Sequence, residues 1–334
     1  MMKIAINGLG RIGRAVLKQV IERPEMELLA VNELNPADNI AYLLKYDSVY
    51  GRYDKSVNVD EQGRLVVNGK PFRTTQEKDP AALDWKSLDI DLVFECTGVF
   101  RKKPDLEKHL EAGARHVLLS APEKTGEVPM IVHGVNKLES PSTMLSTASC
   151  TTNCIAPVAE VMSRRVGVVK AAMTTIHAYT ASQSVIDGPK KKWRRGRAAA
   201  VNFVPTTTGA AEATTKILPD LAGRFDGAAV RGPVPSGSLT DITFLVNRST
   251  SVEEINGIFE EEAESDRYRG ILGVSHDPLV SSDIIGDSRA SVVDLNTTQV
   301  IDGDLVKLMR WYDNEWGYAS QMVREAGHML EGKV

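Results

Sequence analysis

The sequence predicts an α/β protein with a doubly wound parallel sheet in its first half and an α+β second half containing a mixed or antiparallel sheet. The length of 334 residues suggests about two domains. In the first half, continuous apolar runs alternate with helix-spaced apolar patterns, which is typical of parallel strands covered on both faces. After about residue 150, strands follow one another without a helix after each, which favours antiparallel pairing.

The first domain is predicted over residues 1–149. Its expected strands are Lys3–Ile6, Met26–Val31, Asp91–Cys96 and His116–Leu119. A helix is expected over Ile12–Glu22, because apolar residues recur there at helical spacing. The segment Tyr46–Pro71 has hairpin character, with Asn68-Gly69 as its turn signal.

The second domain is predicted over residues 150–314. It is expected to begin with a helix, Thr151–Arg165. Strands are expected at Val168–Ile176, Ile242–Val246 and Leu305–Tyr312, and a long loop over Ala178–Arg197. Apolar residues at helical spacing from Gly317 to Leu330 predict a closing helix. We assign this helix to residues 315–334 and expect it to complete the first domain.

Composition and charge exclude several classes of protein. The net charge of −4 offers no global basic field for nucleic acid or an anionic membrane. No apolar run approaches the roughly 20 residues of a membrane span, and the start lacks a signal-peptide pattern. The chain has three cysteines, and this small, odd number does not suggest a disulfide framework. We therefore expect a cytosolic protein, and we predict no metal site.

A dinucleotide-binding pattern occupies the first strand–turn–helix unit. Gly8, Gly10 and Gly13 form G-x-G-x-x-G, in which they permit the tight turn, the approach of a pyrophosphate and close packing of helix on strand. Glu33 follows Gly13 by twenty residues, where a carboxylate can bind ribose hydroxyls and repel a 2′-phosphate. The sequence therefore predicts a Rossmann-type domain that binds NAD in preference to NADP.

A cysteine and a histidine form a candidate nucleophile and base. Cys150 opens a predicted helix, whose N-terminus is expected to lower the pKa of its thiol. Cys154 lies one helical turn further inside, and Cys96 lies in an apolar strand, so both are weaker candidates. His177 ends a strand and could face the thiol. From these residues alone, a structural histidine is an equally good interpretation.

Basic and hydroxyl residues indicate anion binding. Lys190–Arg197 holds six cations in eight residues, Thr206–Gly209 follows, and Arg231 precedes a Gly-Pro turn. Guanidinium groups, hydroxyls and backbone N–H groups are suited to phosphate. A merely solvated loop is one alternative, and nucleic acid binding around Trp193 is a weaker one.

These motifs together resemble glyceraldehyde-3-phosphate dehydrogenases over essentially the whole chain. The matching segments are Asn7–Arg14, Ser149–Cys154, His177, Thr206–Ala211 and Tyr312–Tyr318. The resemblance implies that Cys150 is the nucleophile of a thiohemiacetal and thioester mechanism, and that His177 is its base. It also implies phosphorylating oxidation of glyceraldehyde 3-phosphate to 1,3-bisphosphoglycerate with NAD.

The resemblance assigns further residues. For NAD it implies Arg11, Ile12, Glu33, Lys78, Ser120 and Asn314, with Asn314 on the nicotinamide carboxamide. For the substrate phosphate it implies Thr180 and Arg231. For inorganic phosphate it implies Ser149, Thr151, Arg195, Thr208 and Gly209. The segment 178–200 corresponds to the family's S-loop, which packs against a neighbouring subunit, so a homotetramer is implied.

Two positions depart from the family pattern, and one tripeptide is shared with a sister enzyme. Glu33 stands where most members have Asp, and Lys78 where Arg is frequent. Asn32-Glu33-Leu34 is shared with erythrose-4-phosphate dehydrogenase, but that sister enzyme tends to lose the Thr206–Ala211 pattern retained here. Glyceraldehyde 3-phosphate is the expected substrate. The alternatives are erythrose-4-phosphate oxidation, a non-phosphorylating oxidation, and a redox-sensing NAD-binding protein without turnover.

Overall fold

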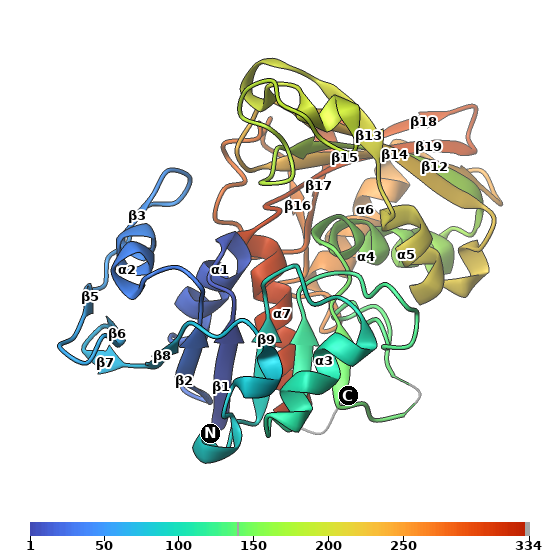
Figure 1. Ribbon diagram of the computed structural model, residues 1–334. Coiled ribbons are helices and arrows are strands. Elements are labelled where there is room, and N and C mark those ends of the chain that lie inside the picture. The colour runs from blue at the N-terminus through green and yellow to red at the C-terminus, as the bar shows by residue number, and fades with distance from the viewer. Residues whose placement is uncertain (139, 331–334) are drawn as a thin grey trace. The chain divides into compact units, whose positions relative to one another are not determined.

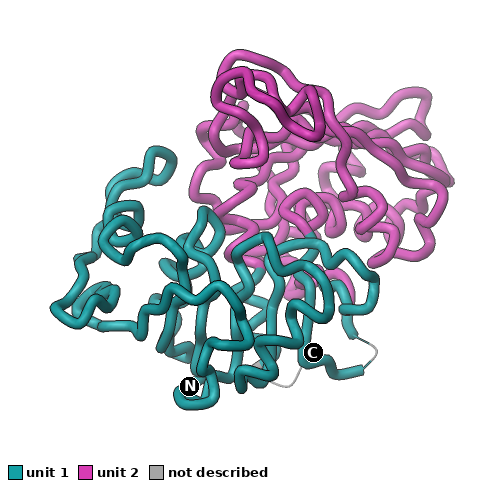
Figure 2. The backbone as a smooth tube through the Cα atoms, viewed as in Figure 1, with its two compact units in different colours: residues 1–131, 137–148, 322–334 teal, residues 132–136, 149–321 magenta. Residues whose placement is uncertain are grey.

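The computed structural model describes residues 1–138 and 140–330 and confirms the predicted α/β class (Figure 1). The chain forms two compact units (Figure 2). Unit 1 comprises residues 1–131, 137–148 and 322–334, and unit 2 comprises residues 132–136 and 149–321. Residues 331–334, which the sequence assigned to the closing helix, lie outside the described residues.

Unit 1 contains a six-stranded sheet in the order β11-β10-β9-β1-β2-β8. Its strands are β1 (Met2–Asn7), β2 (Met26–Asn32), β8 (Arg73–Thr75), β9 (Leu92–Glu95), β10 (His116–Leu119) and β11 (Met144–Ser146). All of these pairings are parallel. The four strands predicted from apolar runs are confirmed, and consecutive residues such as Ile4, Ala5 and Ile6 are fully buried. Both faces of the central strands therefore belong to the core.

Helices and small hairpins complete unit 1. The helices are α1 (Arg11–Val20), α2 (Ala37–Lys45), α3 (Lys103–Glu111), η1 (Pro80–Ala82) and η2 (Lys86–Leu88). The short strands are β3 (Tyr46–Asp47), β4 (Gly51–Arg52), β5 (Val57–Val59), β6 (Leu65–Val67) and β7 (Lys70–Pro71). The predicted Asn68-Gly69 turn joins β6 to β7, with φ values of 52° and 77°. These left-handed angles are what a two-residue hairpin turn requires.

Unit 2 contains an eight-stranded mixed sheet in the order β13-β14-β12-β15-β19-β17-β16, with β18 paired to β19. Its strands are β12 (Val168–Ala178), β13 (Val204–Thr207), β14 (Phe225–Gly232), β15 (Ser238–Val246), β16 (Leu272–Ser275), β17 (Ser291–Asp294), β18 (Gln299–Ile301) and β19 (Leu305–Tyr312). β12 pairs parallel with β14 and antiparallel with β15. The predicted mixed sheet is therefore confirmed.

Unit 2 also contains helices, several of which contact strands of this sheet. They are α4 (Cys150–Arg165), α5 (Ala210–Ile217), α6 (Val252–Glu264), η3 (Trp193–Gly196), η4 (Ala199–Val201), η5 (Pro219–Leu221) and η6 (Leu295–Thr297). α4 contacts β12, β15, β17 and β19. Helix α7 (Trp316–Leu330) continues from unit 2 into unit 1 along the chain. Among the described residues, no helix combines the length and apolar composition of a membrane span.

Candidate active site

In unit 1, a cavity of about 470 Å³ lies beside the Gly-rich turn between β1 and α1. Its lining includes Gly8, Gly10, Glu33, Lys78 and Thr97. Four residues that the sequence assigned to the dinucleotide thus lie around one cavity. Ligands of parallel α/β sheets bind at the carboxyl ends of the strands, where this cavity is found.

The three glycines of the turn differ in what an added Cβ atom would meet. Gly8 has a φ of +90°, and a Cβ atom there would lie 2.8 Å from the Thr97 backbone. A Cβ atom at Gly13 would lie 1.9 Å from the Gly8 carbonyl oxygen, so only glycine allows α1 to pack so closely. A Cβ atom at Gly10 would have no heavy atom within 4 Å. That open approach to the backbone fits a dinucleotide pyrophosphate.

The acid at the end of β2 is held against the same turn. One carboxylate oxygen of Glu33 accepts a hydrogen bond of 2.8 Å from the Leu9 N–H, and the other accepts 2.7 Å from the Asn35 side chain. These bonds fix the carboxylate at the cavity wall, where it can bind ribose hydroxyls. The cavity, the open backbone at Gly10 and the fixed Glu33 carboxylate therefore fit NAD.

The other residues assigned to NAD lie outside the cavity lining. Arg11 forms an ion pair of 2.6 Å with Asp47 and stacks over Tyr50. Ile12 lies in the first turn of α1. The Ser120 N–H donates to the Glu95 carbonyl, at 3.0 Å. Their assignment to the cofactor stays a prediction.

A buried polar network lies beneath the cavity. The fully buried Glu95 carboxylate accepts hydrogen bonds from the Asn7 side chain at 2.6 Å, from the Thr97 N–H at 2.8 Å and from the Thr97 hydroxyl. His109 contacts the same carboxylate at 3.1 Å. Asn7 also accepts a bond of 2.8 Å from Asn32. This network joins the ends of three strands, and no local pattern in the sequence predicts it.

In unit 2, the structure brings Cys150 and His177 together. Cys150 is the first residue of α4, and the Ser149 side chain caps that helix by accepting a bond of 3.1 Å from the Thr152 N–H. His177 lies near the end of β12. Its Nε2 atom is 3.4 Å from the Cys150 sulfur. The distance allows direct proton transfer between thiol and imidazole.

The other imidazole nitrogen of His177 has two neighbours. Nδ1 lies 2.7 Å from the Ala178 carbonyl oxygen and 2.5 Å from an Arg231 nitrogen. Arg231 also donates to that carbonyl, at 2.8 Å. Burial and the charge of Arg231 lower the pKa of His177 to about 3, so its imidazole is neutral in the free chain. In the tautomer with Nδ1–H on the carbonyl, Arg231 donates to that carbonyl and not to Nδ1, and Nε2 is the proton acceptor.

The expected fall in the pKa of Cys150 is opposed by its surroundings. Burial raises the pKa of the thiol above its ordinary value, while the Arg231 charge and bonds from Thr151 act in the other direction. Burial thus opposes the fall in the thiol pKa that the helix start was expected to produce, and Nε2 of His177 lies near enough to accept the thiol proton.

The residues that the sequence assigned to anion binding in unit 2 make the following contacts. Arg195 donates to the Thr206 hydroxyl at 3.0 Å, and its charge acts on both His177 and Arg231. The Thr208 hydroxyl accepts a hydrogen bond of 3.1 Å from the N–H of Ala210, the first residue of α5. Gly209, between these two residues, is the N-cap of that helix. The Thr180 hydroxyl contacts that of Ser182 at 2.8 Å. These contacts account for part of the basic loop without nucleic acid.

Two sets of hydroxyl contacts were missed from the sequence. The Tyr312 hydroxyl lies 2.9 Å from the hydroxyls of both Thr151 and Thr175 and so ties the start of α4 to β12. Ser238 contacts the side-chain oxygen of Asn314 at 2.8 Å. The resemblance marked Tyr312–Tyr318 as specific, but sequence alone gives no sign of which serine reaches it.

The remaining candidates are structural. Cys96 and Cys154 are buried, and burial raises the pKa of each thiol.

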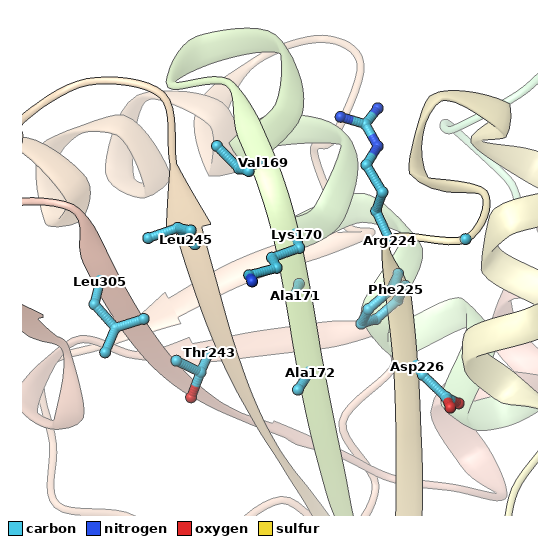
Figure 3. Close-up of a pocket in the computed structure, with 11 residues that line it drawn as sticks. Val169, Lys170, Ala171, Ala172, Arg224, Phe225, Asp226, Thr243, Leu245 and Leu305 are labelled. Carbon is cyan, nitrogen blue, oxygen red and sulfur yellow. The ribbon is translucent and has the colours of Figure 1, made fainter.

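A cavity of about 740 Å³ on the unit 2 sheet is lined by Lys170, Arg224, Phe225 and neighbouring residues (Figure 3). None of the residues assigned from the sequence lines it. The larger cavity is therefore not the candidate active site.

Comparison with known proteins supports the interpretation of both units. Residues 2–103 match the family model described as glyceraldehyde 3-phosphate dehydrogenase, NAD binding domain, and residues 149–314 match its C-terminal domain. The chain is 45% identical over 333 residues to glyceraldehyde-3-phosphate dehydrogenase 1 of Bacillus subtilis, covering 99% of this chain and 98% of that protein. It is 46% identical to the glyceraldehyde-3-phosphate dehydrogenase of Clostridium acetobutylicum, with 99% of each chain covered. For that of Geobacillus stearothermophilus the identity is 45%, with 98% of each covered.

Proposed function

The chain belongs to the glyceraldehyde-3-phosphate dehydrogenase family, and we propose that it oxidises glyceraldehyde 3-phosphate to 1,3-bisphosphoglycerate with NAD and inorganic phosphate. One observation carries the proposal at the level of residues. The sulfur of a helix-start cysteine lies 3.4 Å from a histidine nitrogen, in a unit that also gathers arginines and threonines. A nucleophile, a base and anion ligands are what acyl phosphate formation requires.

Cys150 forms the covalent intermediate. Its sulfur attacks the aldehyde carbon while the thiol proton moves to Nε2 of His177. The resulting oxyanion is stabilised by the protonated imidazole and by the Cys150 N–H. NAD, when bound, would accept the hydride, that is, the hydrogen of this carbon with both electrons of the broken C–H bond, so that a thioester would remain on Cys150. The thioester retains oxidation energy that a free carboxylate would lose.

Phosphate then releases the product from Cys150. An oxygen of inorganic phosphate attacks the thioester carbon, the C–S bond breaks, and the sulfur regains its original state after proton return from His177. We assign Ser149, Thr151, Arg195, Thr208 and Gly209 to this phosphate. Thr180 and Arg231 are assigned to the phosphate of the substrate. Charge-assisted bonds from guanidinium groups suit both anions.

The residues that would hold NAD come from both halves of the sequence. They are Gly8, Gly10, Arg11, Ile12, Gly13, Glu33, Lys78, Ser120 and Asn314. Glu33 favours NAD over NADP, because its carboxylate would repel a 2′-phosphate. We also propose the domain division 1–149 and 150–314, with 315–334 completing the first domain.

The chain is further proposed to act as a homotetramer in the cytosol. Apolar side chains of the S-loop region support association, because Val185, Ile186 and Trp193 are 81%, 77% and 89% exposed. The three cysteines are free thiols, which suits a reducing compartment.

The decisive experiment measures NADH formation from glyceraldehyde 3-phosphate with and without inorganic phosphate, beside arms with erythrose 4-phosphate and with NADP. Fast turnover that depends on phosphate and prefers NAD is expected. Cys150→Ala should abolish turnover while retaining NAD binding, whereas Cys154→Ala, one helical turn further, should remain active. Oxidation without phosphate, a strong erythrose 4-phosphate preference, or an active Cys150→Ala enzyme would each overturn the proposal.

A further inference from the structure

We infer that Ser238 is a positioning residue for the cofactor: its hydroxyl fixes the side-chain amide of Asn314, so that the NH2 group is presented to the nicotinamide carboxamide. The inference rests on the proposed function, in which Asn314 binds that carboxamide. Its evidence is a chain of hydrogen bonds within unit 2, from Ala178 through Ser238 to Asn314.

The Asn314 amide has one occupied end and one available end. The residue is only 4% exposed. Its oxygen lies 2.8 Å from the Ser238 hydroxyl and 3.5 Å from that of Ser236. Within residues 1–138 and 140–330, its Nδ2 atom makes no hydrogen bond. A nearly buried amide with a free NH2 group is suited to donate to a ligand oxygen.

The direction of each bond follows from proton counting. The Ala178 N–H donates to the Ser238 oxygen at 3.0 Å. That bond uses a lone pair of the hydroxyl and leaves its single proton for the Asn314 oxygen. Among the described residues, the Asn314 oxygen is the acceptor for the Ser238 O–H, so a reversed amide would leave this buried proton without an acceptor. Ser238 therefore selects the orientation in which Nδ2 faces away from it.

Ser236 makes a useful contrast. Its hydroxyl lies nearer to Asp313, at 3.1 Å, than to Asn314, at 3.5 Å. Its proton is therefore directed mainly to the Asp313 carboxylate, which is the stronger acceptor. Both serines are almost fully buried, so Ser236 is a matched control for the loss of a buried hydroxyl.

The position of Ser238 in the sheet explains why it can make both contacts. It begins β15, the strand between β12 and β19, and pairs with Tyr312 of β19. Ala178 ends β12, and its carbonyl accepts the bonds from His177 and Arg231. The Ala178 N–H thus helps to orient Asn314 through Ser238, and the Ala178 C=O orients His177. Removing the Ser238 hydroxyl should disturb Asn314 without disturbing His177.

The test compares the affinities of NAD and ADP-ribose, which lacks the nicotinamide, by titration calorimetry. Ser238→Ala should weaken NAD binding about five- to tenfold, the value of one hydrogen bond, and leave ADP-ribose binding unchanged. Asn314→Ala should show the same selectivity with an equal or larger loss, and Ser236→Ala a smaller one. The rate of Cys150 alkylation without cofactor should be unaltered in Ser238→Ala.

Two results would overturn the inference while leaving the proposed function intact. One is a normal NAD affinity in Ser238→Ala when Asn314→Ala has lost it. The other is an equal loss of NAD and ADP-ribose affinity in Ser238→Ala, which would indicate general structural damage. If Asn314→Ala itself binds NAD normally, the Asn314 assignment in the proposed function is wrong and the inference fails with it.

Discussion

Arg231 is the residue that we propose binds the substrate phosphate. One of its terminal nitrogens contacts His177 and Ala178, while its buried Nε atom has no hydrogen-bond partner among the described residues. Arg231→Ala should lower kcat/KM for glyceraldehyde 3-phosphate about ten- to hundredfold, because it removes a charge-assisted bond of roughly 1.5–3 kcal/mol. Activity on unphosphorylated glyceraldehyde should change much less.

Steady-state kinetics on the two aldehydes provide the measurement. Arg197→Ala is the control, because Arg197 belongs to the same basic region but pairs with Asp187 at 2.9 Å on the surface. A preference for the phosphorylated aldehyde that survives in Arg231→Ala would remove Arg231 from the substrate site.

His177 predicts a specific loss of stability in acid. Its pKa is lowered to about 3 in the folded chain by burial and by Arg231, against an ordinary value of 6.5. Below pH 6.5 the unfolded chain therefore binds a proton that the folded chain does not. The contribution of neutral His177 to the free energy of unfolding is therefore fully present above pH 6.5 and is lost as the pH falls toward 3. Between about pH 7 and about pH 4 this histidine should account for a loss of roughly 3 kcal/mol.

Urea unfolding of the wild type and of His177→Asn at these two pH values checks the sign. Asparagine does not titrate, so the variant should lose less free energy of unfolding on acidification. An equal pH dependence in both chains would show that His177 is protonated in the folded state.

Single residues differ in how far the sequence could identify them. Cys150 and the glycines were identified because their chemistry depends on local features, a helix start and a tight turn. His177 needed its strand end to face that helix, which the residues alone left open. The hydrogen bonds of Ser238, Tyr312 and Glu95 could not be predicted, because they join segments far apart in sequence.

Elements with a strong local signal were predicted well. Strands β1, β2, β9 and β10 are continuous apolar runs, and β19 was predicted with its exact bounds, Leu305–Tyr312. β14 was missed, since its sequence Phe-Asp-Gly-Ala-Ala-Val-Arg-Gly has little β-propensity. It is a strand because β12 and β13 pair with it on either side.

The network around Glu95 leads to a prediction at the scale of elements. Trp85 donates to Nδ1 of His109 at 3.1 Å, so the neutral imidazole carries its proton on Nε2 and donates it to Glu95. Glu95 thus accepts bonds from β1, α3 and the segment after β9, including Thr97, which packs on Gly8. Glu95→Gln would set an NH2 group against these donors.

Glu95→Gln should therefore lower the free energy of unfolding by about 2 kcal/mol or more. It should also weaken NAD binding, because the turn that carries Gly8 loses support. Thermal unfolding and NAD titration measure the two effects. Glu25→Gln is the control, since Glu25 is a surface carboxylate 46% exposed and should change stability by less than about 0.5 kcal/mol. Normal stability in Glu95→Gln would mean that the carboxylate is not what holds the turn.

At the scale of the whole molecule, charge is distributed unevenly. The net charge is −4, yet six cations fall within Lys190–Arg197. The structure directs Lys192 and Arg195 to threonine oxygens at 2.7 and 3.0 Å and pairs Arg197 with Asp187. Three of the six cations therefore have hydrogen-bond or ion-pair partners within the chain, which composition alone could not show.

The apolar residues of the S-loop region are the feature that a single chain leaves unexplained. Val185 and Ile186 are 81% and 77% exposed, in a segment whose backbone is fixed by bonds such as Ser184 N–H to the Arg195 carbonyl, at 3.0 Å. Exposed apolar side chains on an ordered segment are typical of a subunit contact. Replacing both with serine should shift the proposed homotetramer toward smaller species, with little effect on the fold of the subunit.

Sedimentation velocity at several protein concentrations measures this shift, and circular dichroism verifies the fold. Val280→Ser is the matched control: Val280 belongs to the same unit and is 57% exposed, but it lies outside the S-loop. Dissociation of the double variant alone would assign the contact to the S-loop. If the double variant and wild type sediment identically, the exposed pair does not hold subunits together, and association must use another surface of the chain.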